Sequence, residues 1–482
     1  MSTTERQLLE NIKLEGKHIL SKQFLFDWAA VYSIAIKKSP DLAELGINTK
    51  IDTVHTTGSN NGPYTFKQTP YYFDNIARIW QHNTDNDIDI LGNLNYKKSF
   101  KWADLDLKIG GLYRNKTRAN IQNEYDLRPT TNSNGVKQVY TGINSTQWTV
   151  YDTHGTQAYD INNYHLFEDI SAGYIQFKII THNLDVFGGV RIEKTHQGYQ
   201  LNTFYSTGIN GITKNYTDML PSIALKYKLN TKTNIRLSYN KSIARPNFYE
   251  LVPASSYSSS SANISQGNPY LKHTIAENFD LRYELFPRND EQLFVGVFYK
   301  SLKDPIEYAY INGLTYQPVN YGNAEVYGSE LVFTKYFGNF GITGNYTYIY
   351  SRISSIKSFT DVVARITFDS LQSRPLQGQT DNTLNLSVLY KNEKDRLFVQ
   401  AAYQYLGKKL GLVYPVYGFD YYQQPQSFLS LSAEKVLSNK RYTLFGKLNN
   451  ILNTATVNKI NSLLTTSDTY KANFLIGIRY SN

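Results

Sequence analysis

Apolar and polar residues alternate along short segments of this 482-residue chain, from its beginning to its end. In DIDILGNLNY, which ends at Tyr96, Ile88 and Ile90 share one face, and Asp87 and Asp89 share the other. Successive side chains of a β-strand point to opposite faces, so a period of two predicts strands with one apolar and one polar side. The same alternation recurs in the segments 103–114, 278–286, 342–350 and 384–390.

The spacers between these strands are alternately short and long. The short ones lie near residues 22, 99, 182, 232, 288, 338, 393 and 439, and the long polar ones span roughly 38–77, 119–165, 200–217, 244–273, 304–321, 352–378, 410–425 and 450–471. Tight periplasmic turns and long extracellular loops alternate in this way in up-and-down barrels of the outer membrane. The sequence therefore predicts an all-β, antiparallel, up-and-down transmembrane β-barrel.

A large soluble all-β protein, such as a propeller, is the main alternative fold. Propellers repeat with a fixed blade period, and the sequence has no such repeat. One face of the predicted strands also carries charged residues, such as Asp104, Lys108 and Glu284, which are costly to bury in a dry core. A water-filled lumen accommodates them, and this favours the membrane barrel.

The predicted strands number about 17, whereas transporters of this architecture are expected to have about 22. The last strand, near residues 472–482, is predicted to run toward the periplasm. Counting back through the alternation, the first strand (residues 11–20) runs the same way, which places Met1 on the extracellular side. We therefore expect residues 1–482 to form a single domain, an incomplete barrel whose first strands lie outside this sequence.

Composition and charge narrow the functional classes. The net charge is +10, but lysine and arginine are dispersed rather than clustered, so nucleic acid is not an expected partner. The chain has no cysteine, no apolar run of 18 residues and no signal-peptide pattern at its start. No metalloprotease, P-loop or nucleophile-elbow motif occurs, so we predict neither catalysis nor a cofactor.

A set of motifs, in order along the chain, carries a family resemblance. It includes GKH (16–18), GGLYRNKTR (110–118), GGVRIEKT (188–195), YTDMLPSIALKY (216–227), SIARPNFYELVP (242–253), GNPYLKHTIAENFDLRYE (267–284), NYGNAEVYGSEL (320–331), NYTYIYS (345–351), RPLQGQTDN (374–382) and KLNNILNT (447–454). The set resembles the C-terminal part of the barrel of TonB-dependent outer-membrane receptors, especially those of the Bacteroidetes type. In that family the positions of Arg245, Pro246, Gly267, Asn268 and Pro269 are recognisable structural motifs.

The resemblance implies an importer for a scarce nutrient, such as a ferric siderophore or another large ligand, energised by an inner-membrane TonB complex. It also implies contact with outer-membrane lipid and lipopolysaccharide. The plug domain, the TonB box and the first barrel strands of that family are absent from this sequence, so we expect the chain alone to be non-functional. The proline-locked pair Arg245-Pro246 is predicted to end a strand at the extracellular rim.

Two groups of residues are candidate ligand contacts. Aromatic and histidine side chains of the segment 119–165 could stack on a flat ligand, although they could equally form a membrane-interface girdle or pack within the loop: Tyr125, Tyr140, Trp148, Tyr151, His154 and Tyr159. Inward-facing arginines could attract an anionic substrate, or they could form ion pairs inside the lumen: Arg114, Arg191, Arg236 and Arg282. We expect His273 to be a surface loop residue rather than an iron ligand.

Two other functions remain open from the sequence. A barrel of this size without a plug predicts a passive, porin-like channel. Long extracellular loops are also compatible with a surface-binding or adhesion protein that transports nothing.

Overall fold

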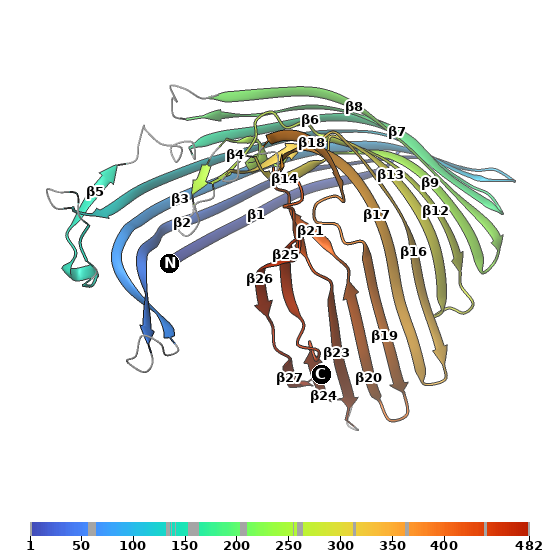
Figure 1. Cartoon of the computed structure of the whole chain (residues 1–482). Coiled ribbons are helices and arrows are strands. Elements are labelled where there is room, and N and C mark those ends of the chain that lie inside the picture. The colour runs from blue at the N-terminus through green and yellow to red at the C-terminus, as the bar shows by residue number, and fades with distance from the viewer. Residues whose placement is uncertain are drawn as a thin grey trace.

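The computed structural model describes residues 2–55, 64–131, 135, 137–139, 141–152, 163–202, 210–253, 255–257, 264–311, 315–361, 366–437 and 441–480. Within them, one antiparallel sheet of 19 strands forms the wall (Figure 1). Its strands are β1 (Ser2–Ile19), β2 (Phe24–His55), β3 (Tyr64–Ser99), β4 (Asp104–Pro129), β5 (Trp148–Asp152), β6 (Tyr164–Ile180), β7 (Leu184–Leu201), β8 (Gly211–Asn230), β9 (Thr233–Ala244), β12 (Thr274–Leu285), β13 (Gln292–Lys303), β16 (Asn323–Phe337), β17 (Phe340–Asp361), β18 (Ile366–Arg374), β19 (Asn382–Asn392), β20 (Leu397–Leu406), β23 (Gln426–Val436), β24 (Tyr442–Asn449) and β27 (Asn473–Tyr480).

Two of these 19 strands, β5 and β18, only extend the outer ends of β4 and β17, which leaves 17 wall strands among the described residues. The prediction of about 17 strands is confirmed. Each wall strand pairs with the next along the chain, as an up-and-down sheet requires. In the described residues β1 pairs with β2 and β27 pairs with β24, and the two end strands do not pair with each other. Figure 1 shows the result, an open, strongly curved sheet.

The short connections all lie at one end of the wall. They span residues 20–23, 100–103, 181–183, 231–232, 286–291, 338–339, 393–396 and 437–441, the last including residues 438–440 outside the described part. Seven of the eight predicted turn positions are therefore confirmed, and the eighth, near residue 439, lies outside the described residues. Connections at the opposite end, which we call the outer end, are long and carry two small four-stranded sheets.

These outer sheets are built from separate long connections. The first contains β10 (Ser255–Tyr257), β11 (Ile264–Gln266), β14 (Ile306–Tyr310) and β15 (Thr315–Asn320). The second contains β21 (Lys409–Leu412), β22 (Tyr421–Gln423), β25 (Ala455–Ile460) and β26 (Leu463–Thr469). A four-residue helix, α1 (Phe248–Leu251), and a 3₁₀ turn, η1 (Ile143–Ser145), complete the described elements.

The segment 38–77 is not the loop that its polarity suggests. β2 and β3 are 32 and 36 residues long, and they remain paired out to His55 and Tyr64. About ten residues suffice for a strand to cross a membrane, so this hairpin extends far beyond the wall. Pairing between the two strands satisfies the backbone groups of this polar sequence.

The wall has two chemically distinct faces. Cross-strand registers align apolar side chains on one side, the apolar face: Ile90, Tyr113, Ile175, Ile192, Ile223, Leu237, Leu281, Val297, Leu331 and Tyr346. The opposite side, the polar face, carries Asp89, Arg114, Gln176, Arg191, Ser222, Asn240, Asp280, Glu330 and Asn345. An outer-membrane barrel turns the first face to lipid and the second to its interior.

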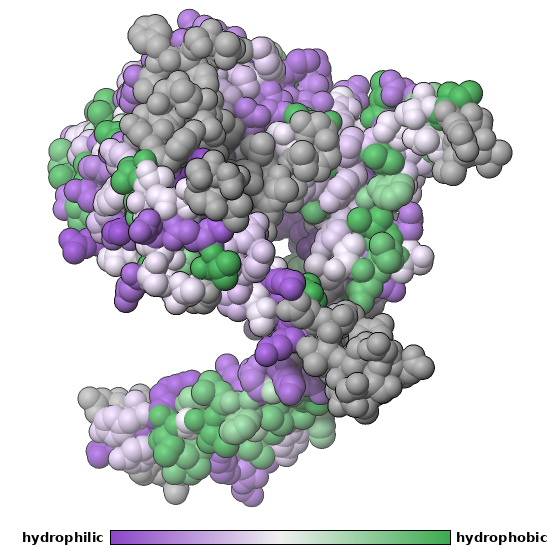
Figure 2. Space-filling model, turned by 60° about the vertical axis from the view of Figure 1, so that its left-hand side comes forward, coloured by the Kyte–Doolittle hydropathy of each residue, from purple (hydrophilic) through white to green (hydrophobic). Residues whose placement is uncertain are grey.

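The apolar face is exposed in the single chain. Ile109 and Ile175 on neighbouring strands are 57% and 52% exposed. Figure 2 shows apolar side chains gathered in continuous areas of the surface. Beyond Ile192 on β7 and Met219 on β8, this face becomes polar with Lys194 and Thr217, which marks the outer limit of the apolar band. No helix in the described residues is long and apolar enough to cross a membrane.

Candidate functional site

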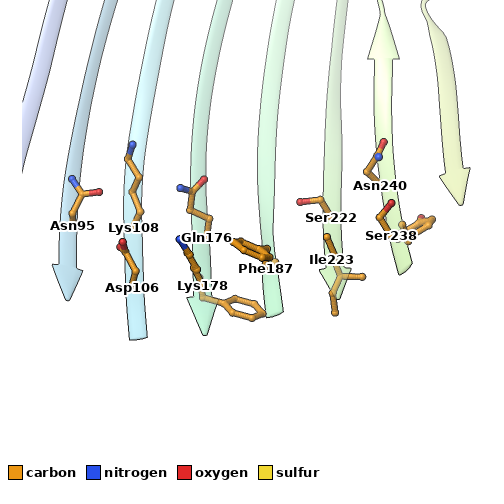
Figure 3. Close-up of a pocket in the computed structure, with 14 residues that line it drawn as sticks. Asn95, Asp106, Lys108, Gln176, Lys178, Phe187, Ser222, Ile223, Ser238 and Asn240 are labelled. Atoms are coloured by element: carbon orange, nitrogen blue, oxygen red, sulfur yellow. The ribbon is translucent and has the colours of Figure 1, made fainter. Parts of the chain in front are cut away.

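A groove runs along the polar face over β3, β4 and β6–β9. Its lower part, near the short turns, is a cavity of about 480 Å³. Figure 3 shows polar side chains of β3, β4, β6, β8 and β9 around it: Asn95, Asp106, Lys108, Gln176, Lys178, Ser222, Ser238 and Asn240. Phe187 lies among them, with the Lys178 ammonium 5.4 Å from the centre of its ring. The groove therefore offers amides, hydroxyls and charges of both signs to the interior.

A second cavity of about 560 Å³ continues this groove toward the outer end. Both cavities are lined by Gln176 and Ser222, so they are adjacent along the same strands. Gly189 forms part of its floor, where a Cβ would lie 2.6 Å from the carbonyl oxygen of Ile175 on β6. Only glycine permits that close approach of the two strands.

Two arginines share one carboxylate in the upper cavity. Glu193 accepts hydrogen bonds from both Arg191 and Arg245. Arg245 also donates to Thr195, with Nη2 and Nε 3.0 and 3.1 Å from its hydroxyl oxygen. The Arg191 guanidinium lies 5.6 Å from the centre of the Tyr174 ring. The cluster keeps a positive excess beside an aromatic ring, which suits a planar anionic ligand.

The segment that follows β9 folds onto the polar face above this cluster. β9 ends at Ala244, directly before Arg245-Pro246, and Pro246 is buried, so the predicted strand end is confirmed. Phe248 and Leu251 of α1 then pack against side chains of β6 and β7. The resulting core contains Leu166, Tyr199, Leu201, Phe248, Leu251, Val252 and Leu271. The core fixes the outer segment against the wall.

The family-motif residues hold this segment in shape. Asn247 begins α1 with a capping box, in which its backbone N–H donates to Glu250 at 2.7 Å. Asn268 donates from its side chain to the Pro318 carbonyl at 3.0 Å. A Cβ on Gly267 would lie 2.0 Å from the Val252 carbonyl oxygen, so a glycine is required there. Pro269 is buried beside them.

His273 is more enclosed than a surface loop residue. Its ring stacks on Tyr216 with centroids 4.0 Å apart and an interplanar angle of 12°. Its Nε2 lies 3.1 Å from Oδ1 of Asp218, and the two side chains are only 17% and 7% exposed. The stacking and the hydrogen bond with Asp218 together hold His273 against the polar face, because both partners project from β8.

Burial shifts the pKa values of two side chains on β8, Tyr216 and Lys214. These positions lie beyond the apolar band, where burial raises the pKa of Tyr216 to about 12. Burial also lowers the pKa of Lys214 to about 8. Lys214 donates to the Leu271 carbonyl and so adds another link between the wall and the outer segment.

Buried charges connect the other outer segments. Arg374 pairs with Glu307 at 2.7 Å, and Lys357 pairs with Asp420. Gln377 joins the same group, since its backbone N–H donates to Glu307 and its side chain donates to the carbonyls of Tyr308 and Gly411. The RPLQGQTDN motif contains Arg374 and Gln377, but the sequence carried no signal for their partners.

The four candidate arginines all form ion pairs. Arg114 lies 2.7 Å from Asp87 and 3.2 Å from Asp89. The remaining pairs are Arg191 with Glu193, Arg236 with Glu284 and Arg282 with Glu330. Ion pairing inside the lumen, one of the two interpretations from the sequence, is present. A ligand-contacting role for these arginines stays a prediction.

The aromatic candidates lie elsewhere, on the outer part of β4 and β5. Tyr125 packs edge-on against Trp80 with centroids 5.9 Å apart. Trp148 packs against Phe73 at 5.2 Å and donates to the Ile143 carbonyl. Tyr151 belongs to β5, and its backbone pairs with Asp126. Tyr140, His154 and Tyr159 lie outside the described residues. The aromatic partners Trp80 and Phe73 lie on β3, outside the segment 119–165, so stacking on a ligand and packing within the loop both stay predictions.

In the parts of the chain that the structure describes, no group of three or more histidine, aspartate or glutamate side chains could hold a metal ion.

Comparison with solved structures shows the same fold over the whole chain. The ferric-catecholate import receptor Fiu of E. coli K12, in its closed form, superposes with a TM-score of 0.63 at 15% identity, covering 100% of this chain and 65% of that one. The siderophore receptor PiuA of Acinetobacter baumannii superposes with a TM-score of 0.63 at 14% identity, covering 99% of this chain and 65% of that one. The pyoverdine outer membrane receptor FpvA of Pseudomonas aeruginosa, bound to pyoverdine, has a TM-score of 0.60 at 12% identity, covering 100% of this chain and 62% of that one. The chain thus spans less than two thirds of the length of these receptors.

No curated protein sequence matches the chain significantly. A family model, described as the outer membrane protein beta-barrel family, matches residues 41–480. That match, together with the curved antiparallel wall and its apolar face, shows that the chain belongs to the outer membrane protein β-barrel family and resides in the outer membrane.

Proposed function

We propose that residues 1–482 form the C-terminal part of the barrel of a TonB-dependent importer, of the Bacteroidetes type, whose ligand is a ferric siderophore. An inner-membrane TonB complex is the partner that supplies energy, and the imported ligand passes along the polar face. The outer segments bind the ligand first, and the groove of β3–β9 receives it.

The groove with its arginine cluster carries this proposal. A receptor for a ferric catecholate must attract an anionic complex with flat aromatic rings. Arg191 and Arg245 outnumber their shared carboxylate Glu193, and the Tyr174 ring lies beside them. A site of this kind binds a planar anion through charge and stacking together. Likeness in fold to receptors named for siderophores supports the same choice.

Uptake of iron provides the test. Cells with and without the reading frame would be given iron-55 bound to catecholate, hydroxamate or mixed siderophores under iron limitation. We expect the loss of uptake for one siderophore class, and only when TonB is functional. In the full receptor, Arg191→Gln should weaken ferric-siderophore binding by about tenfold, on the scale of one charge-assisted contact. Arg288→Gln, at a side chain 70% exposed in a short turn, is the matched control.

Other outcomes separate the alternatives. Diffusion of small sugars that persists without TonB would support the porin-like channel instead. Binding of a ligand to whole cells without uptake, whether TonB is present or not, would support a surface-binding protein. Unchanged uptake of every ferric siderophore after deletion would overturn the proposal.

A further inference from the structure

A separate cavity of about 300 Å³ lies where the wall forks at its outer end. β17 pairs with β19 along residues 340–348 and with β18 along residues 353–361. Residues 349–352 lie at the fork, and the segment 375–381 crosses it. The Leu376 N–H donates to the Ser351 hydroxyl at 3.0 Å, and the Ile349 N–H donates to the Asp381 carbonyl at 2.8 Å. The cavity is thus built from fixed backbone on several sides.

The cavity is lined by cations and tyrosines. Tyr350 and Arg352 project on the apolar side of β17, and both are exposed. Lys408 and Tyr422 close another side, with the Lys408 ammonium 4.1 Å from the centre of the Tyr422 ring. Arg374 lines the buried end and is only 4% exposed. Arg352 and Lys408 therefore bring positive charge to a space large enough for a small ligand, while Arg374, ion-paired with Glu307, borders its buried end.

Hydrogen-bonding capacity remains unused at this cavity. In the described residues neither Arg352 nor Lys408 forms an ion pair. The Nε of Arg374 is buried and, among the same residues, has no hydrogen-bond partner. A buried donor without a partner is costly, so an acceptor from a ligand would stabilise it.

Three carboxylates lie near the cavity, and one of them, Glu307, is paired with Arg374. Asp381 lines the cavity, but its Oδ1 rests against Gly407, at 1.9 Å from the place a Cβ would occupy there. Glu325 stands opposite Arg352 in the register of β16 and β17 and accepts a hydrogen bond from the Tyr299 hydroxyl at 3.4 Å. Among the described residues, Arg352 and Lys408 remain the cations of the cavity lining without an ion pair.

The tyrosines of the apolar face next to the cavity indicate that it lies at the level of lipid headgroups. Below it, the apolar face of β17 carries Tyr346, Tyr348 and Tyr350, and Tyr350 packs on Tyr327 of β16 with centroids 4.9 Å apart. Tyrosines gather at the membrane–water interface, and Arg352 is the next outward residue. A molecule in this cavity could keep acyl chains along the apolar face while its polar head enters the fork.

We infer that this fork binds a phosphorylated sugar headgroup, with the phosphate held by Arg352 and Lys408 and the sugar against Tyr350 and Tyr422. A cation near a membrane surface favours the binding of anionic lipid, and tyrosine faces pack on the apolar side of sugar rings. The headgroup belongs either to an outer-leaflet glycolipid or to a soluble phosphosugar. This inference is independent of the import proposal, because it involves neither the groove nor TonB.

The test uses the full chain folded in phosphatidylcholine vesicles containing lipid A, in either its phosphorylated or its dephosphorylated form. After extraction in mild detergent, native mass spectrometry counts the lipid A molecules retained per chain. We expect one phosphorylated lipid A on the unchanged chain and roughly tenfold weaker retention for the double variant Arg352→Gln/Lys408→Gln. Lys101→Gln/Lys394→Gln removes two exposed cations from short turns and serves as the matched control.

Every outcome bears on the inference. If the double variant Arg352→Gln/Lys408→Gln (the fork variant) loses phosphorylated lipid A and the control retains it, the headgroup belongs to a lipid. Binding of glucosamine 1-phosphate in detergent with the same dependence on Arg352 and Lys408, and without retention of lipid A, supports a soluble phosphosugar. Equal retention by the fork variant and the control, or equal retention of dephosphorylated lipid A, overturns the inference. Circular dichroism and melting of each variant confirm that the wall is folded.

Discussion

Arg374 and Glu307 form a two-pronged ion pair inside the outer segments, although they lie 67 residues apart. Nη2 and Nη1 of the arginine lie 2.7 and 3.3 Å from the two carboxylate oxygens. The side chains are 1% and 4% exposed. Because Arg374 ends β18 and Glu307 lies in β14, the pair fastens two outer segments to each other.

Removing the carboxylate of this pair should destabilise the outer segments strongly. Glu307→Gln leaves the Arg374 guanidinium charged and buried without a counter-ion, which costs about 3–5 kcal/mol. Urea unfolding of the chain in detergent measures the change in the free energy of unfolding. Limited proteolysis shows whether the outer segments loosen first.

Two comparisons make that result specific. Lys13→Gln removes an exposed ion pair with Glu15, whose side chains are 55% and 66% exposed, and should change stability by less than about 1 kcal/mol. Arg374→Met/Glu307→Leu removes both charges and should recover much of the loss. A loss no larger for Glu307→Gln than for Lys13→Gln would contradict the buried pair.

Gly267 should not tolerate even a methyl group. A Cβ there would lie 2.0 Å from the Val252 carbonyl oxygen and 2.9 Å from that of Tyr249. A backbone carbonyl cannot move away without displacing the neighbouring residues. Gly267→Ala should therefore cost about 2 kcal/mol or more, measured by thermal or urea unfolding. In Gly446→Ala the nearest atom is 3.9 Å away, so that control should stay within about 1 kcal/mol. Equal effects of the two substitutions would show that the segment moves aside.

The wall could be predicted from the sequence because its pattern is local. Alternation such as Asp87-Ile88-Asp89-Ile90 marks a strand face within a few residues, and each short turn follows in order. The outer part of the long hairpin of β2 and β3 was not predicted, because a polar stretch of sequence resembles a loop. Only the backbone pairing shows that it is a pair of strands.

The pairs at the outer end could not be predicted for another reason. Glu307 with Arg374, and His273 with Asp218, meet only after whole segments have folded over the wall. No spacing in the sequence links residues separated in this way. Of the two arginines in the groove, Arg191 was predicted from its strand face and Arg245 only as a family-motif residue at a strand end. Their shared carboxylate partner, Glu193, decides how much charge remains for a ligand.

The packing of Lys214 makes the outer segment sensitive to pH. Burial lowers its pKa to about 8 from an ordinary value of 10.5. Between these values the unfolded chain holds a proton that the folded chain has released, so stability rises with pH from about 8 toward 10.5. Urea unfolding from pH 8 to 10 should show this rise, and the rise should be smaller in Lys214→Met.

The titration of Tyr216 sets the upper pH limit of that measurement, and a second lysine serves as its control. The raised pKa of Tyr216, about 12 against 10, makes stability fall with pH above 10, so the window must end there. Lys394→Met changes an exposed lysine in a short turn and should keep the full rise. An identical slope for Lys214→Met and Lys394→Met would show that Lys214 does not carry the effect.

His273 should fasten the segment after β9 to the wall. His273→Ala removes the stacking on Tyr216 and leaves the buried Asp218 carboxylate without its partner, at a cost of about 2 kcal/mol. Hydrogen exchange of residues 248–252 and 271–273 should accelerate, and His273→Gln, which keeps a donor, should recover part of the protection. His182→Ala, at an exposed position in a short turn, should change nothing. Unaltered exchange in His273→Ala would mean that the hydrophobic core around Leu251 is enough to hold the segment. Faster exchange would mean that His273 helps to fasten the segment to the wall.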